Sequence, residues 1–283
     1  LHRSNASLHC IGYGGRSVLD TSYDLIEPEK YTTCAVFSSP HSGTRYPEYF
    51  LEEALLDNRT IRSSEDAFVD QLFAAAPRFG APLLAARYPR AYVDLNRNED
   101  ELDPALILGA NRRSSNPRVA AGLGVIPRVV AEGKTIRAGK LSLRDAVSRL
   151  RHGYHPSPTK LQQLMNRQRA AHGIAILFDC HSMPHDALSA VPAKDPRPEV
   201  VLGDRFGASA ARWVVNAAAG YFEEAGFRVA RNAPFAGGYI TQHYGRPSRG
   251  HHALQIEIDR SLYMDEQRIV PSADFDGIRA RLD

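Results

Sequence analysis

The chain has 283 residues, and its 43% hydrophobic and 24% charged residues are typical of a globular protein with a full core. Its 35 basic and 32 acidic residues nearly balance, and no nucleic-acid module or basic–aromatic pattern accompanies them, so nucleic acid is not an expected partner. No apolar run approaches the roughly 18 residues that predict a membrane-spanning helix, so no membrane association is expected.

Hydrophobic periodicity and Gly and Pro breakers predict the elements in chain order. The first 33 residues are predicted to be a polar, extended lead-in, and residues 40–47 a turn-rich loop. Hydroxyl residues followed by acids predict that a helix begins at residues 63–66. The elements predicted after it are one or two strands in 82–94, helices at 141–150, 159–172 and 208–225, and strands at 174–179, 199–203, 227–230 and 253–257.

This alternation predicts a single three-layer α/β domain over residues 1–283 with a mixed central sheet, since no linker divides the chain. Residues 103–158 are predicted to be an insertion that acts as a lid, because long irregular insertions are more often functional than idle. Its Arg-rich part has two interpretations, a solvated face or a wall that attracts a small anion.

The cysteines predict no disulfide framework. Cys10, Cys34 and Cys180 are odd in number and lie far apart, without a CxxC pair. Cys34 and Cys180 fall in apolar runs, which predicts buried hydrophobic roles and suits a reducing compartment. The first residues contain no signal peptide, and since the first residue is Leu1, some N-terminal sequence is expected to be missing.

Four predicted strands end in polar residues of types that carry catalysis. These ends lie at His41, at the segment 94–97, at His181 and at Glu257. The carboxyl ends of parallel strands open into one crevice, so we expect the four groups to meet there. Together they predict a zinc hydrolase.

His41 and His181 are the predicted metal-binding histidines, because neutral imidazole is the commonest zinc ligand. A catalytic zinc has about three protein ligands, so a carboxylate is also needed. The chain has no HExxH helix, and the acidic helix start supplies Glu65 and Asp66, for which helix capping is the alternative role. Cobalt, nickel or manganese would fit the same ligands.

Glu257 is the predicted general base, because a carboxylate beside a metal-bound water can take its proton. Its structural alternative is an ion pair with Arg260 or Arg97. Arg97 and Asn96 are predicted to bind a substrate carboxylate through the planar guanidinium fork and an amide donor. Asp94 either orients a metal-binding imidazole or pairs with Arg97.

Several segments together resemble the N-formylglutamate amidohydrolase family, over about residues 34 to 266. They are PHSGT at 40–44, SEDAFVD at 64–70, VDLNR at 93–97, YHP at 154–156, DCHS at 179–182, NAPFAGGY at 232–239 and QIEI at 255–258. The resemblance implies the phosphorylase/hydrolase-like fold of the related zinc carboxypeptidases. It also implies an amidohydrolase that cleaves N-formyl-L-glutamate to formate and L-glutamate, the last step of histidine breakdown, in the cytoplasm.

Carried over residue by residue, the resemblance implies that His41 and His181 bind the metal. Carboxypeptidases place the metal carboxylate three residues after the first histidine, where this chain has Thr44. Asp66 takes that role by its likeness to a recurring acidic position of the family, with Glu65 as the second choice.

The same comparison gives the remaining site residues their roles. Asp94 would support the first histidine, Asn96 and Arg97 would bind the substrate carboxylate, and Glu257 would be the general base.

The predicted substrate is a small dianion, so a second cation is needed for its side-chain carboxylate. The candidates are Arg112 and Arg113 in the insertion and Arg246 or Arg249 before the last strand. The oligomeric state, monomer or homodimer, stays open.

The alternatives are a zinc carboxypeptidase, an amidohydrolase for other N-acyl amino acids, and a non-catalytic protein that binds metal or amino acid. A non-catalytic binding protein would have no use for Glu257. A serine hydrolase using Ser42 or Ser182 is disfavoured, because the chain lacks the GxSxG elbow.

Overall fold

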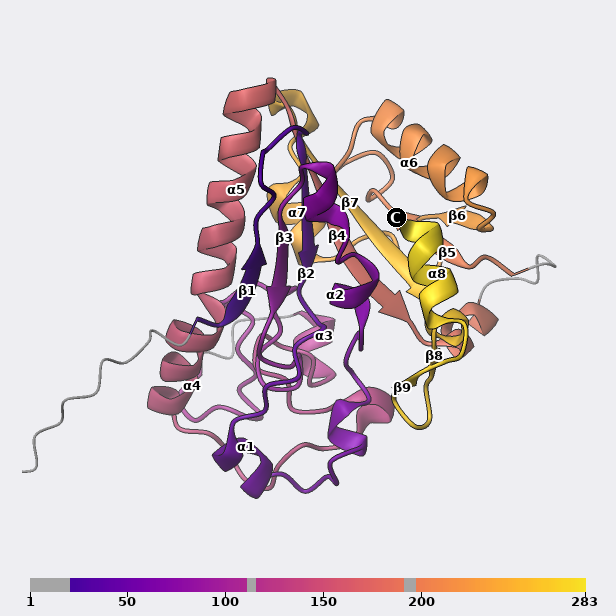
Figure 1. Cartoon of the computed structure of the whole chain (residues 1–283). Coiled ribbons are helices and arrows are strands. Elements are labelled where there is room, and N and C mark those ends of the chain that lie inside the picture. Colours follow the sequence, from indigo (N-terminus) through magenta and orange to yellow (C-terminus); the bar gives the residue numbers. More distant parts are fainter. Residues whose placement is uncertain (1–20, 111–115, 191–196) are drawn as a thin grey trace, which may run out of the picture.

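A seven-stranded mixed sheet forms the centre of the molecule (Figure 1). The computed structural model describes residues 21–110, 116–190 and 197–283. The four central strands run parallel, whereas β1 is antiparallel to β3 and β5 is antiparallel to β7. In spatial order the strands are β1 (Tyr23–Ile26), β3 (Leu83–Ala86), β2 (Ala35–Ser39), β4 (Ala175–Met183), β7 (His251–Asp259), β5 (Val200–Gly203) and β6 (Val229–Arg231).

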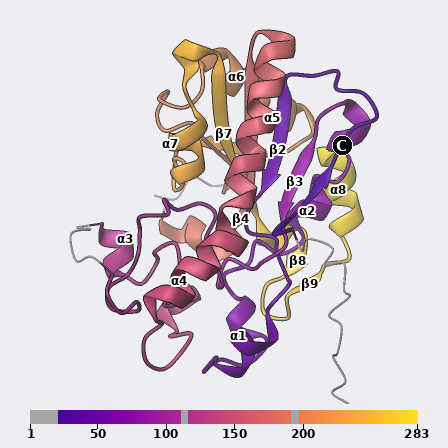
Figure 2. The ribbon, with the colours of Figure 1, turned by 90° about the vertical axis from the view of Figure 1, so that its left-hand side faces the viewer.

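Helices cover both faces of this sheet, as Figures 1 and 2 show. Side chains alternate between the faces along a strand. Leu177 and Ala253 pack with α5 and α7 on one face, and Ile176 and Leu254 pack with α2, α6 and α8 on the other. The α-helices are α1 (Glu48–Glu52), α2 (Val69–Leu72), α3 (Pro117–Ala120), α4 (Leu143–Arg149), α5 (Pro156–His172), α6 (Arg212–Glu224), α7 (Tyr239–Tyr244) and α8 (Phe275–Leu282). The predicted three-layer α/β fold with a mixed sheet is confirmed.

Shorter elements complete the chain. A separate pair of strands, β8 (Met264–Asp265) and β9 (Val270–Pro271), lies near the C-terminus. The 3-10 helices are Thr60–Arg62, Ala76–Phe79, Ala131–Gly133, His185–Ala190, Pro247–Arg249 and Arg260–Leu262, and a π-helical turn at Leu150–Tyr154 leads from α4 towards α5.

A second hydrophobic core lies beyond the carboxyl ends of the parallel strands. It joins residues of the predicted insertion, such as Ile126 and Leu141, to Phe50 and Tyr92 from earlier loops. Helices α1, α3 and α4 all lie in this part, below the sheet in Figure 1. The insertion therefore packs over the end of the sheet where active sites of open α/β folds are found.

Two predicted boundaries are wrong. No helix begins at residues 63–66, which form a turn at Ser63 and Ser64 and then irregular backbone. Helix α2 begins at Val69, after Phe68, whose left-handed φ of 67° does not belong to a helix. Strand β3 ends at Ala86, so Asp94 lies in a loop and not at a strand end.

The other predicted helices and strands exist with shifted bounds. Strand β4 extends to Met183, which places His181 inside the strand instead of after it. Strand β1 lies within the predicted lead-in, where it pairs with β3. Of the cysteines, Cys180 is buried and Cys34 half-buried, and both are free, whereas Cys10 lies outside the described residues.

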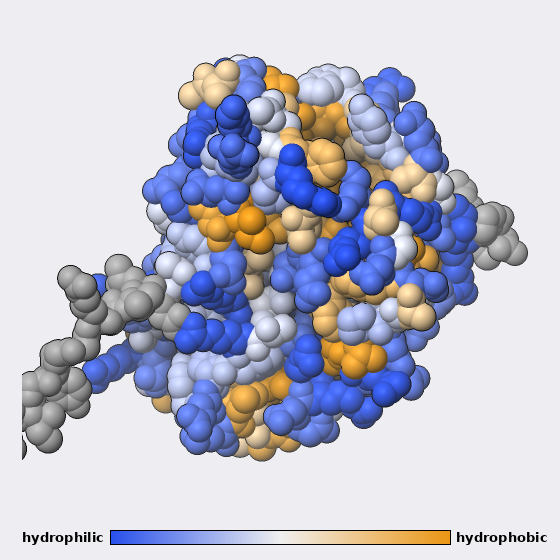
Figure 3. Space-filling view, in the orientation of Figure 1, coloured by the Kyte–Doolittle hydropathy of each residue, from blue (hydrophilic) through white to orange (hydrophobic). Residues whose placement is uncertain are grey.

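The outer surface mixes polar and apolar residues. On the face shown in Figure 3, apolar side chains form separate patches among hydrophilic ones. Among the described helices, none is both long enough and apolar enough to cross a membrane.

Candidate metal centre and cavity

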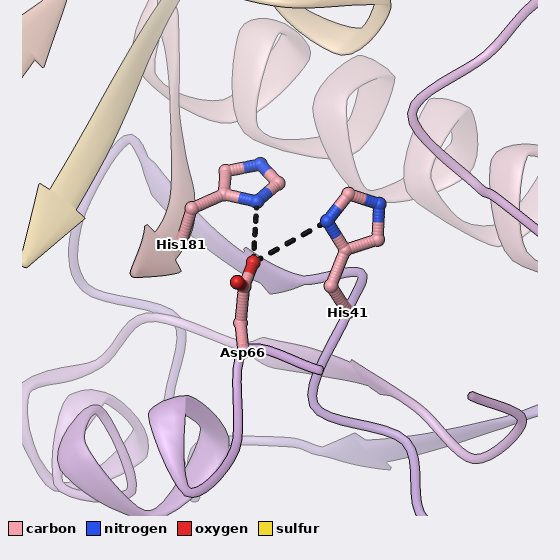
Figure 4. A group of neighbouring side chains, drawn as sticks. All are labelled: His41, Asp66 and His181. Atoms are coloured by element: carbon pink, nitrogen blue, oxygen red, sulfur yellow. Dashed lines mark hydrogen bonds and ion pairs between the residues drawn. The ribbon is translucent and has the colours of Figure 1, made fainter. Parts of the chain in front are cut away.

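Three buried side chains converge at the carboxyl end of the sheet (Figure 4). Oδ2 of Asp66 lies 2.9 Å from Nδ1 of His181 and 3.3 Å from Nδ1 of His41. One nitrogen or oxygen from each residue falls within 4.8 Å of the other two. The structure thus brings together the three residues predicted to bind a metal.

Backbone structure places each member of this cluster. His41 follows β2 in a loop, and His181 projects from the neighbouring parallel strand β4. The backbone amide of Asp66 donates to the carbonyl of His41 at 3.0 Å, which ties the two loops together.

A buried carboxylate lies next to Nε2 of each imidazole, the ring nitrogen that faces away from Asp66. Nε2 of His41 lies 2.8 Å from Oδ1 of Asp94, and Nε2 of His181 lies 3.0 Å from Oδ2 of Asp179. Carboxylates in this position fix the imidazole proton on Nε2 and leave Nδ1 free to act as a metal ligand. The pair of Asp94 with His41 has hydrogen-bond geometry, whereas Asp179 meets His181 only as an ion pair, and sequence reasoning missed Asp179.

Nδ1 of the two histidines and the carboxylate of Asp66 suit the binding of a cation. Nδ1 of His41 is buried and makes no hydrogen bond with the described residues, although Asp66 lies 3.3 Å away. Burial opposes the charged form of Asp66, but the hydrogen bond to His181 and the nearby charge of His41 hold its pKa well below the usual range. Burial also opposes charge on His181, yet Asp179 and Asp66 raise its pKa well above the usual value. A donor set of two imidazoles and one carboxylate therefore fits a divalent metal, whose binding would displace protons.

Two arginines hold the carboxylates around the cluster. Nη2 of Arg260 donates to Oδ1 of Asp66 at 3.0 Å, and Nε of Arg90 donates to Oδ2 of Asp94 at 2.9 Å. Sequence reasoning considered Arg260 only as a partner for Glu257 and missed Arg90. Arg260 and Asp66 lie 194 residues apart, so nothing local in the sequence signals their contact, whereas Arg90 lies only four residues before Asp94. The need of a buried carboxylate for a partner suggests that such contacts exist.

Glu257 lies directly beside His181. The two residues are paired in register on the parallel strands β4 and β7, and their side chains point to the same face of the sheet. Nε2 of Gln255 donates to Oε1 of Glu257 at 2.8 Å, and the backbone amide of Gly238 donates to Oε1 of Gln255. Burial raises the pKa of Glu257 to about 7.

These groups face one cavity of about 790 Å³. Residues 118–133 of the insertion form part of its wall, and the turn at 234–238 forms another part. Asn96 and Arg97 also line it. Nε of Arg97 donates to the carbonyl of Leu123, a residue of the insertion, at 2.8 Å.

Gly238 packs against the amide of Asn96. A Cβ atom at this position would lie 2.5 Å from Nδ2 of Asn96, so only glycine fits. Oδ1 of Asn96 accepts a hydrogen bond from the amide of Ile240, in the first turn of α7. This contact fixes the orientation of the Asn96 side chain in the cavity wall.

Other predicted site residues lie elsewhere. Glu65, the second choice for the metal carboxylate, is bound by Arg62 and Tyr46 and does not belong to the cluster. Arg246 and Arg249 precede β7 and so lie at its amino end, whereas Glu257 lies near its carboxyl end; neither lines the cavity.

Arg246 bonds to backbone carbonyls of Gln242 and Gly245, away from the other predicted substrate-binding residues. Arg112 and Arg113 lie outside the described residues.

Comparison with known proteins gives one consistent result. The model of the N-formylglutamate amidohydrolase family matches residues 33–264. Proteins named N-formylglutamate deformylase from Pseudomonas putida and Pseudomonas aeruginosa are 30% and 32% identical to the chain, and each alignment covers 82% of both sequences. The crystal structure of N-formylglutamate amidohydrolase from Ralstonia eutropha JMP134 superposes with a TM-score of 0.86 at 33% identity, covering 93% of this chain and 94% of the other.

Proposed function

The chain belongs to the N-formylglutamate amidohydrolase family, and from this premise we propose that it hydrolyses N-formyl-L-glutamate to formate and L-glutamate. The observation that carries the proposal is the position of Glu257, next to His181 and inside the cavity that the histidine–aspartate cluster lines. A general base beside a metal-binding cluster is the arrangement that amide hydrolysis by water requires.

The same proposal includes a divalent metal, zinc in the first place, held by Nδ1 of His41, Nδ1 of His181 and the carboxylate of Asp66. When bound, such an ion polarises an acyl carbonyl and makes a water molecule more acidic. Asp94 and Asp179 would keep both imidazoles in the ligand tautomer, and Arg90 and Arg260 would keep Asp94 and Asp66 ionised and in place.

Glu257 supplies the proton transfers in this mechanism. Its carboxylate accepts a proton from the attacking water while the water oxygen bonds to the formyl carbon. As the C–N bond breaks, Glu257 returns the proton to the departing amine of glutamate. A pKa near 7 suits both the acceptance and the return of a proton near neutral pH. Arg97 and Asn96 hold the α-carboxylate from the cavity wall.

A small substrate is favoured over a peptide. Residues of the insertion close one side of the cavity, where a carboxypeptidase would need an open groove for its substrate chain. A binding protein without catalysis would gain nothing from placing a carboxylate such as Glu257 in a buried site. A cytoplasmic role in the last step of histidine breakdown completes the proposal, on the family relationship alone.

Removal of the metal tests the proposal directly. Dialysis against a chelator should abolish release of glutamate from N-formyl-L-glutamate, and stoichiometric zinc should restore it, because Glu257 alone cannot activate water sufficiently. Free amine is measured before and after zinc is added back, with N-acetyl and N-formyl derivatives of other amino acids in parallel. Full turnover by metal-free protein would contradict the metal mechanism, and inactivity of the zinc-loaded protein towards N-formyl-L-glutamate would contradict the substrate.

The carboxylates behind the histidines should tune metal affinity. We expect Asp94→Asn and Asp179→Asn each to weaken zinc binding by about 10- to 100-fold, because an amide orients the imidazole less firmly and lowers its basicity. Competition with a chromophoric chelator measures the affinity, and circular dichroism checks the fold. Asp276→Asn on the exposed part of α8 is the matched control and should bind zinc as the unaltered protein does. Unchanged affinity in both buried variants would show that the two carboxylates serve only the fold.

A further inference from the structure

The arginines that line the cavity fall into two groups. Within the described residues they are Arg90, Arg97, Arg118 and Arg260. Arg90 is paired with Asp94, and Arg260 with Asp66, in contacts of 2.9 and 3.0 Å. Their charges are matched inside the protein, so they have little left to offer a ligand.

Arg118 is different. It lies on α3 within the insertion, it is exposed, and its guanidinium makes no ion pair or hydrogen bond with any described residue. Glu132, the acid of the insertion that shares this wall, is bound instead by Lys134 at 2.9 Å. Arg118 therefore presents an unmatched positive charge to the cavity.

Arg97 lies within the electrostatic reach of Arg118. Burial lowers the pKa of Arg97, and the positive charges of Arg90 and Arg118 lower it further, against the opposing effect of Asp94. Among the described residues, the acidic partners of Arg97 are distant ones, Asp94 at 3.9 Å and Glu101 at 4.0 Å. Two cations that repel each other across one cavity favour a ligand with two negative charges.

We propose that Arg118 is a specificity-determining residue that binds the side-chain carboxylate of an N-formyl dicarboxylic amino acid, while Arg97 binds the α-carboxylate. This inference rests on the proposed function and takes the place of Arg246, which lies at the opposite end of β7. It also gives the insertion a chemical role: α3 carries the group that recognises the side chain, and the sheet carries the groups that break the bond.

The test compares N-formyl-L-glutamate with N-formyl-L-glutamine, which is nearly isosteric and lacks the second charge. The unaltered enzyme should prefer the glutamate derivative. Arg118→Gln should lower kcat/KM for it by about 10- to 100-fold, mostly through KM, because one charge-assisted contact is lost. Activity on the glutamine derivative should stay unchanged, and Arg118→Lys should recover part of the preference. Arg144→Gln on the exposed part of α4, outside the cavity lining, is the control and should leave both substrates unaffected.

A binding measurement separates this inference from the proposed function. Calorimetric titration of the zinc-loaded protein with L-glutamate and L-glutamine should show a preference for glutamate that Arg118→Gln removes. Protein that binds glutamate through Arg118 yet hydrolyses no formyl amide would overturn the function and leave the dianion site standing. An active enzyme without preference for the second charge, or an Arg118→Gln variant that keeps the preference, would overturn the role of Arg118 alone.

Discussion

Replacing Glu257 by glutamine should reduce kcat by about 10²–10⁴-fold, the usual contribution of a general base, while the protein keeps its metal. Glutamine has nearly the same shape and can still accept the hydrogen bond from Gln255, so the local structure should persist. It cannot accept a proton from water. Turnover and zinc content, measured on the same preparation, therefore separate an enzyme from a protein that only binds metal.

The pH profile gives this prediction a second readout. Burial raises the pKa of Glu257 to about 7, and a bound dication would lower it from there. The base works only when ionised, so kcat/KM should fall with decreasing pH through a midpoint at or below about 7, and this limb should vanish in Glu257→Gln. The exposed Glu224→Gln variant on α6 should behave as the unaltered enzyme does. Near-normal turnover of Glu257→Gln would exclude its role as the base.

Replacing Asp66 by asparagine should have the other large effect. Zinc affinity should fall by more than about 100-fold, the upper limit for residues that only support a ligand, and turnover should be lost in parallel. Asp66 faces both imidazoles and supplies the only carboxylate of the cluster among the described residues. Asparagine retains an oxygen that can accept the hydrogen bond from Arg260, which limits the damage to the fold. Metal analysis by mass spectrometry after gel filtration measures the effect.

The neighbouring Glu65 provides the control, because it was the second choice for the same role. Its carboxylate is held by Arg62 and Tyr46, so Glu65→Gln should lower the unfolding temperature and leave the zinc stoichiometry at its original value. If Glu65→Gln lost zinc and Asp66→Asn kept it, the assignment of the two acids would have to be reversed.

Local sequence was sufficient to predict those parts of the site that sit on the sheet. The apolar runs before His41, His181 and Glu257 are real strands, and parallel pairing brings their carboxyl ends to one edge. The run before Asp94 has the same apolar pattern, but it is a loop and not a strand. Tyr92 and Val93 are apolar because they pack in the second core, so periodicity alone could not distinguish this loop from a strand.

Contacts between distant segments could not be predicted in this way. Arg260 bonds to Asp66 across 194 residues of sequence, a proximity that only the folded chain reveals. Arg90 and Asp179 lie only four and two residues from their partners, Asp94 and His181. Arg118 stands in an irregular insertion that offers no periodicity from which its direction could be inferred. The position of Arg246, in contrast, is predictable from the sequence. Arg246 precedes β7 and so lies at the amino-terminal edge of the sheet, whereas active sites lie after the carboxyl ends of parallel strands.

Because His181 and Glu257 are paired in register on β4 and β7, the sheet and the insertion can change independently. Adjacent strands are held about 4.8 Å apart by backbone hydrogen bonds, so the spacing of the proposed ligand His181 and the proposed base Glu257 does not depend on which side chains surround them. The insertion packs in a second hydrophobic core, which it shares with loops that precede it in the chain. Engineering of new amidohydrolases from this scaffold should therefore diversify residues 116–133 and leave β4 and β7 untouched, since selectivity can then be rewritten without re-optimising the bond-breaking step.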